Sequence, residues 1–212
     1  MKKLRLISVM GFLSMCIAGV CAQDIIKLPD PKTEGGMPLM QALNQRKSGR
    51  EFSPQKLSPP VLSNLLWAAW GVNRPDGHRT APSARNMQEI DVYVATSDGL
   101  YLYEPKQQQL RKILDEDIRA ATGANEYVKD AAANLVYVAD LAKANLNDPA
   151  AIEFYTGADT AFLAQNVYLF CASEGLATVV RGMVDRQALA KVLNLGPQQR
   201  IVLAQTVGYP KD

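Results

Sequence analysis

Four polar residues close together, Arg46, Lys47, Ser48 and Arg50, are the clearest candidates for chemistry in this chain. They follow a helix-like run in the segment MQALNQRKSGREF. Guanidinium groups bind phosphate oxygens in pairs, and a hydroxyl adds a neutral donor. The group therefore predicts a site for a phosphate. The same residues would also suit a solvated helix end, where cations stabilise the negative pole of the helix dipole, so the segment alone leaves both interpretations open.

The elements around this group are predicted from proline, glycine and apolar spacing. Prolines open two expected helices, at residues 38–47 and 59–71. Residues 72–85 are rich in turn formers and predict a loop, a type of segment that often carries sites. Residues 90–103 contain two β-rich runs separated by Asp98-Gly99, which predicts a hairpin.

The second half of the chain mixes helices and strands. The expected elements are a short helix at 115–122, strands at 134–139, 177–181 and 201–207, and helices at 149–173 and 185–193. In the long helix Asp159, Asn166 and Ser173 recur every seven residues, while apolar side chains point in most other directions. Such a helix needs cover on most sides, either in the centre of a domain or at a subunit interface.

Five segments, taken in order, resemble the FMN-dependent nitroreductase family, and the likeness covers nearly all of residues 38–210. They are RKSGREF, APSARNMQ leading into IDVYVA, DTAFLAQNVYLFCASEGL, ATVVRG and VLAQTVGYP. The stretches LLWAAWGVNR, HRTAPSARN and GLYLYEP are most similar to the branch that includes azoline dehydrogenases acting on peptide natural products. The resemblance implies an α+β fold with a mainly antiparallel central sheet flanked by helices, and a homodimer with two FMN sites at its interface.

The resemblance also implies roles for individual positions. The R-x-S-x-R element of the family holds the FMN phosphate, which assigns that role to Arg46, Ser48 and Arg50, with Lys47 alongside. The P-S-x-x-N segment reaches the isoalloxazine ring, commonly from the neighbouring subunit, which corresponds here to Pro82, Ser83 and Asn86. Backbone N–H groups in the turn after a later strand approach the reactive nitrogen of the flavin, which corresponds to Arg181 and Gly182.

Four positions leave the family pattern or remain open. Glu89 and Ile90 stand where many relatives have a proline or tryptophan after the N-x-Q of the ring-contacting loop. Relatives often supply a final basic phosphate ligand near the C-terminus, a role that Lys211 could take. The side chain of Arg181 could bind an anionic substrate in the site, or it could pair with a carboxylate on the surface.

The implied activity is two-electron hydride transfer through FMN to or from a small organic substrate, with no side chain required as acid or base. The alternative is a non-catalytic protein that binds a flavin or another phosphorylated ligand on the same fold. A hydrolase is disfavoured because the single histidine, His78, lacks an arranged acid, and no His or Cys spacing suggests a metal site. Cys171 is expected to be a buried, inert thiol, and Trp67 and Trp70 are expected in the core.

The N-terminus resembles a secretory signal peptide over residues 1–22. Lys2, Lys3 and Arg5 precede an uncharged run, and the pattern predicts cleavage after Ala22. An extended leader at residues 23–37 and one domain at residues 38–212 would follow. The expected protein is exported, either periplasmic or secreted, and has no membrane span.

Loss of the signal changes the charge and the expected redox partners. Residues 23–212 hold 20 basic and 21 acidic residues, so a nucleic-acid partner has no electrostatic support. Nicotinamide cofactors are scarce outside the cytoplasm, which leaves the electron donor open between NAD(P)H and another redox partner.

Overall fold

The computed structural model describes residues 24–144 and 146–211, so the expected signal peptide lies outside the described residues. The strands are β1 (Ile25–Lys27), β2 (Ile90–Thr96), β3 (Gly99–Glu104), β4 (Gln109–Leu114), β5 (Ala133–Asp140), β6 (Ala177–Arg181) and β7 (Gln199–Gly208). The helices are α1 (Leu39–Gln45), α2 (Pro59–Trp70), α3 (Tyr127–Asp130), α4 (Pro149–Glu174) and α5 (Arg186–Val192), with short 3₁₀ turns at Ala84–Asn86 and Arg119–Thr122.

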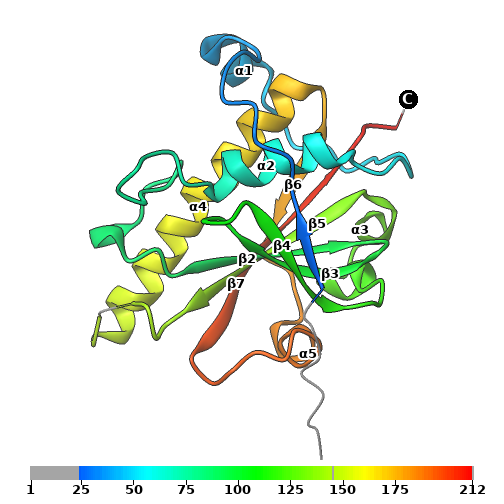
Figure 1. The fold of residues 1–212 in the computed structure, drawn as a ribbon. Coiled ribbons are helices and arrows are strands. Elements are labelled where there is room, and N and C mark those ends of the chain that lie inside the picture. Colours follow the sequence, from blue (N-terminus) through cyan, green and yellow to red (C-terminus); the bar gives the residue numbers. More distant parts are fainter. Residues whose placement is uncertain (1–23, 145, 212) are drawn as a thin grey trace, which may run out of the picture.

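All seven strands form one sheet in the order β1-β4-β3-β2-β5-β7-β6. Every neighbouring pair in this sheet is antiparallel. Helices α1, α2 and α4 gather on one side of the sheet, and α5 lies on the other (Figure 1). This arrangement confirms the expected α+β fold with an antiparallel central sheet flanked by helices.

The period-two alternation of the central strands divides the core into two layers. Val92 and Val94 of β2 pack in the same cluster as the buried residues of α2 and α4, whereas Tyr93 and Ala95 face the cluster that contains Leu189 of α5. The central strands are therefore buried on both faces, and sites can form only at the edges and ends of the sheet.

Helix α4 is the longest element and is capped at both ends. The Asp148 side chain accepts a hydrogen bond from the Ala150 N–H, and Gly175 ends the helix in the left-handed conformation at φ 69°. The three polar residues at seven-residue spacing each bond to a segment from the first half of the chain. Asp159 accepts from Ala84 N, Asn166 donates to Ala68 O, and Ser173 accepts from Met37 N.

Several element predictions need refinement. The expected leader includes β1, which pairs with β4 in the sheet, with Ile25 opposite Arg111. The expected helix at 115–122 is only the 3₁₀ turn Arg119–Thr122. No helix within the described ranges has the length and apolar character needed to cross a bilayer.

Candidate functional site

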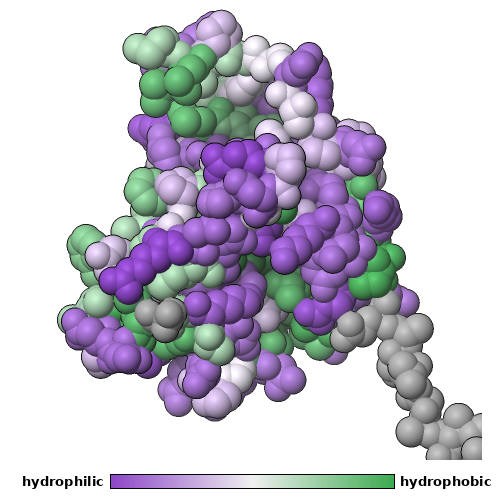
Figure 2. Space-filling view, turned by 60° about the vertical axis from the view of Figure 1, so that its left-hand side comes forward, coloured by the Kyte–Doolittle hydropathy of each residue, from purple (hydrophilic) through white to green (hydrophobic). Residues whose placement is uncertain are grey.

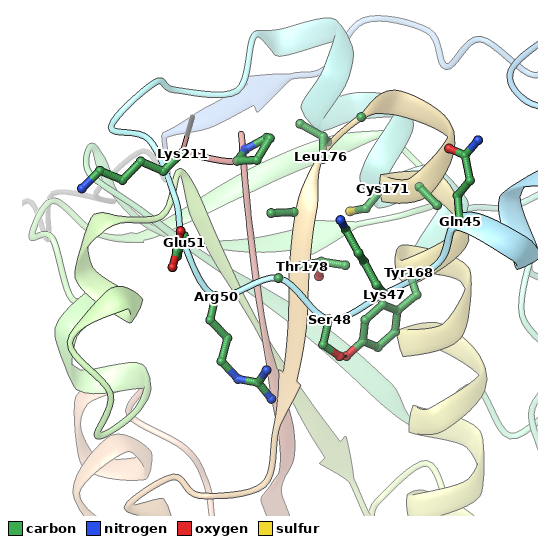
Figure 3. A pocket seen from close by; sticks show the side chains of 15 residues that line it. Gln45, Lys47, Ser48, Arg50, Glu51, Tyr168, Cys171, Leu176, Thr178 and Lys211 are labelled. Atoms are coloured by element: carbon green, nitrogen blue, oxygen red, sulfur yellow. The ribbon is translucent and has the colours of Figure 1, made fainter.

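A cavity of about 540 Å³ lies near the C-terminal end of α4, beside β6. Three of the four residues predicted to hold a phosphate, Lys47, Ser48 and Arg50, line it. Lys211 also lines it, on the opposite side of the same cavity (Figure 3). Lys211, whose role as a phosphate ligand the sequence left open, therefore borders the same cavity as the predicted phosphate ligands.

Segment 48–52 is held against β6 and the C-terminal strand by backbone contacts. Gly49 N donates to Thr178 O at 2.9 Å, and Phe52 forms an isolated bridge with Pro210. A Cβ atom on Gly49 would lie 3.0 Å from the Cβ of Ala177, closer than such contacts normally allow. Glycine at position 49 therefore permits the close approach that places Ser48 and Arg50 at the cavity.

Tyr168 of α4 links this segment to β6 and was not predicted from the sequence. Its hydroxyl lies 2.8 Å from Ser48 Oγ and accepts a hydrogen bond from Val180 N at 3.0 Å. Because the Tyr168 hydroxyl has one proton, and Val180 N–H is already a donor to it, that proton can be donated to Ser48 Oγ. The proton of Ser48 is then free to bind an acceptor in the cavity.

Arg46 takes a different position from the other three residues. Its guanidinium carbon lies 5.2 Å from the centre of the Tyr168 ring, a cation–π distance, and Arg46 is not among the residues that line the cavity. Figure 3 also shows the Lys47 and Arg50 side chains extending from the segment in different directions. Lys47 and Arg50 therefore border the same cavity, whereas Arg46 stacks on Tyr168 beside it, and the predicted phosphate-binding role of Arg46 stays a prediction.

The loop that contains Pro82, Ser83 and Asn86 is fixed by its own side chains. Ser83 Oγ accepts from Gln88 N at 3.0 Å, and Asn86 Oδ1 accepts from Gln88 Nε2 at 2.8 Å. Arg85, Asn86 and Gln88 have φ values of 53°, 55° and 51°. Non-glycine residues at positive φ are uncommon and cluster at functional sites. This backbone is compatible with the predicted binding role, which remains a prediction.

The two predicted parts of the site are separated within one chain. None of Pro82, Ser83 and Asn86 lines the cavity that contains Ser48. The loop is anchored at Asp159 of α4, whereas Ser48 bonds to Tyr168. Nine residues of helix separate these anchors, or about 14 Å along the axis. Within one chain the loop and the Ser48 cavity therefore form separate parts of the predicted site.

A pair of buried carboxyl groups lies behind the loop. Glu89 is 0% exposed and Asp159 is 2% exposed. Burial, and then the neighbouring Asp159 carboxylate, raise the pKa of Glu89 to about 7. Burial also raises the pKa of Asp159, although the Ala84 N–H stabilises its charged form. In the described part of the chain no donor reaches either carboxyl oxygen of Glu89, so a protonated Glu89 is suited to donate to Asp159.

The side chain of Arg181 corrects both interpretations made from the sequence. It is 5% exposed, and its Nε donates to Thr206 Oγ1 at 2.9 Å while its Nη1 donates to Thr122 O at 2.6 Å. Nη2 reaches Asn134 Oδ1 at 3.3 Å. The guanidinium therefore neither faces the cavity nor pairs with a surface carboxylate. The predicted backbone role of Arg181 and Gly182 concerns different atoms and stays a prediction.

Two expectations about the core are confirmed. Cys171 is fully buried, and burial raises the pKa of its thiol well above the usual range, so it is not an available nucleophile. Trp70 is buried in the main cluster. Trp67 is partly buried, and its indole N–H donates to Val72 O at 3.1 Å.

Comparisons of this chain with family models, with known sequences and with solved structures all point to one family. Residues 43–209 match the model of the nitroreductase family. A candidate nitroreductase of Methanocaldococcus jannaschii is 30% identical over 183 residues, which cover 80% of this chain and 89% of that protein. The crystal structure of a candidate nitroreductase from Ralstonia eutropha is 43% identical, with a TM-score of 0.85, and the match covers 89% of this chain and 90% of that one. The structure of a candidate NAD(P)H:FMN oxidoreductase from Staphylococcus epidermidis is 18% identical, with a TM-score of 0.64 and coverage of 86% and 92%, and shows the shared fold.

Proposed function

The chain belongs to the nitroreductase family, and we propose that it is an FMN-dependent oxidoreductase that transfers hydride between bound flavin and a small organic substrate. The observation that carries the proposal is the cavity that brings together Lys47, Ser48 and Arg50, with Lys211 beside them. The name of the Staphylococcus epidermidis protein, which shares the fold, is consistent with flavin as the cofactor.

The chain's own residues suit the phosphate end of such a cofactor. Lys47 and Arg50 supply charge at the cavity, and with the Tyr168 hydroxyl as donor to Ser48 Oγ the Ser48 proton would be available to a phosphate oxygen. Bound FMN would accept and donate the electron pair, so the protein needs only to bind the cofactor and orient the substrate. The Ser83 and Asn86 loop, whose asparagine has both donor and acceptor groups, would contact the ring.

A homodimer would bring the separated parts of the site together. The exposed apolar residues Leu39 and Met40 of α1 are 62% and 75% exposed, and Phe162 of α4 is 48% exposed. Figure 2 shows apolar side chains gathered at the top of the molecule, the end where Figure 1 places α1. We propose that a second copy covers this apolar surface, and that each copy's 82–86 loop approaches its partner's cavity.

The direction of the reaction would depend on the compartment in which the enzyme works. If the signal peptide is removed on export, the enzyme either oxidises a substrate outside the cytoplasm or takes electrons from a redox partner other than NAD(P)H. The resemblance to azoline dehydrogenases favours a dehydrogenase. Purified protein that oxidises NADPH with a nitroaromatic acceptor at ordinary enzymic rates would contradict this part of the proposal.

The visible spectrum of the purified protein tests the cofactor. It would be recorded first without additions, then after anaerobic addition of NADPH, and finally after admission of air. Flavin absorbance supports the cofactor, and bleaching followed by recovery supports turnover. Folded protein that stays colourless with excess FMN would exclude it. Absorbance that cannot be reduced chemically and reoxidised would instead favour a non-catalytic flavin-binding protein.

The contribution of the cavity is tested with Arg50→Gln. We expect FMN affinity to fall at least tenfold, because a hydrogen bond to a charged group contributes about 1.5 to 3 kcal/mol. The matched control is Arg200→Gln, which removes an exposed arginine of β7 that does not line the cavity. Equal affinities for the two variants would show that the phosphate binds elsewhere.

A further inference from the structure

A second cavity, of about 320 Å³, lies between the 71–88 loop region, the start of β2 and the end of β3. It shares no lining residue with the Ser48 cavity. Trp70 and Tyr103, which are 2% and 3% exposed, contribute only the edges of their rings, and Arg79 and Lys106 contribute positive charge. Met87 and Gln88 of the predicted flavin-contacting loop also line it. The combination of aromatic edges and cations is that of a binding site for a small organic molecule.

Arg79 is the residue in this cavity whose bonding is incomplete. Its Nε donates to Gln88 Oε1 at 2.9 Å, and its guanidinium carbon lies 5.5 Å from the centre of the Trp70 ring. Its Nη1 is buried and has no hydrogen-bond partner in the part of the chain that the structure describes. No carboxylate of the described residues forms an ion pair with it. Arg79 as a whole is half-buried, and burial lowers the pKa of its guanidinium, so an anion placed beside it would stabilise its charged form.

The other charged groups of the cavity compensate Arg79 only in part, because Asp91 attracts it from a distance without forming an ion pair and burial still lowers the pKa of Arg79. Asp91 is the acidic residue in its lining, and it already binds Lys143 Nζ at 2.7 Å. Lys143 also approaches Asp140 at 3.5 Å, so it is shared between two carboxylates. Lys106 lies exposed at the lining and adds a further positive charge. The cavity therefore keeps an excess of positive charge around Arg79.

We propose that this cavity binds the carboxylate of a small organic anion, with Arg79 as its charge partner and the edges of the mostly buried Trp70 and Tyr103 rings beneath it. The planar guanidinium matches a carboxylate with two parallel hydrogen bonds. A volume near 320 Å³ is at the small end of ligand pockets, which limits the ligand to a compact molecule. Binding here requires no flavin, so the site can be tested even if the cofactor proposal fails.

Trp70 provides a direct probe of occupancy. We would titrate the purified protein with benzoate and, separately, with benzamide, its neutral isostere, at an ionic strength held constant with chloride. Tryptophan fluorescence and the melting temperature report binding. Benzoate should give a saturating change with at least tenfold higher affinity than benzamide. Equal responses to the two compounds, or no response to benzoate, would overturn the proposal.

Variants then locate the site. Arg79→Gln should weaken benzoate binding at least tenfold, measured by the shift in melting temperature. Arg74→Gln is the matched control, because Arg74 lies in the same loop but is exposed and pairs only weakly with Asp76, at 3.8 Å. An unchanged benzoate affinity in Arg79→Gln would overturn the assignment. If that variant does not fold, Arg79→Lys keeps the charge without the planar fork, and it should also lose affinity while benzamide binding stays the same.

Discussion

The sequence linked two cationic regions to the cofactor, one at Arg181 and one at Lys47 and Arg50. In the structure they differ in how many hydrogen-bond partners their side chains have within the protein. Arg181 is buried, and its nitrogens donate to Thr206, Thr122 and Asn134. Lys47 and Arg50 border an open cavity. A buried arginine whose three nitrogens all have partners stabilises the fold, whereas cations that border a cavity are available to a ligand. Charge alone does not distinguish the two cases.

The largest expected effect comes from breaking the Arg181 network. Arg181→Met should lower the free energy of unfolding by about 3 kcal/mol, because it leaves the buried acceptor Thr122 O without its donor and removes one of the two donors to Asn134 Oδ1. The measurement is denaturation by urea. FMN affinity of the folded fraction should stay near that of the wild type.

The control for this substitution is Arg186→Met on α5. Arg186 also donates to two backbone carbonyls, those of Ile201 and Val202, but it is exposed. Water can replace its bonds, so the loss should be below about 1 kcal/mol. If Arg181→Met left stability unchanged and removed flavin binding, the comparison between the two regions would be reversed.

A smaller effect is expected from the buried carboxyl group of Glu89. In the unfolded chain its carboxyl has a pKa near 4.5, whereas in the folded protein burial raises it to about 7. The folded state therefore holds the extra proton, and the resulting stabilisation is lost as pH rises through 7. Between pH 6 and pH 8 the free energy of unfolding should fall by about 1 kcal/mol.

Glu89→Gln should remove this pH dependence, since an amide can donate to Asp159 without titrating. Glu116→Gln is the control because Glu116 is exposed on the surface. Urea denaturation at several pH values measures both variants. A wild-type profile that is flat, or that rises from pH 6 to pH 8, would show that the carboxyl pair does not hold a proton.

The smallest effect concerns Tyr168, which orients Ser48 at the open cavity. Tyr168→Phe removes the hydroxyl that bridges Ser48 and Val180 N, and FMN affinity should fall about threefold, or about 0.7 kcal/mol. Ser48→Ala should cost more. The double variant should resemble Ser48→Ala alone if Tyr168 acts through Ser48. Additive losses would show that Tyr168 contributes independently of the serine.

Strong local patterns allowed much of the fold to be predicted. The proline and glycine at the ends of α4, and the Asp98-Gly99 turn between β2 and β3, located their elements closely. Strand β4 was missed because Gln109, Arg111 and Lys112 give it no clear apolar alternation. Its pairing partners come from β1 and β3, and such long-range pairing is not recorded in local sequence.

The site was predictable where one short segment supplies it. Lys47, Ser48 and Arg50 are neighbours in sequence, so their common cavity follows from a single motif. Tyr168 could not be found, because it is an aromatic residue on an apolar helix and its role depends on the distant Ser48. The orientation of Arg181 was also hidden, since its acceptors lie 25 to 59 residues away along the chain.

The three hydrogen bonds along α4 restrict how this molecule can move. Asp159, Asn166 and Ser173 each bind backbone from a different segment, at intervals of two helical turns. A one-turn ratchet of the helix, about 5.4 Å, would break all three bonds together. Helix sliding is therefore an unfavourable route for any adjustment to a ligand. Rearrangement should instead be confined to the loops at either end of α4, while the helix itself keeps its position.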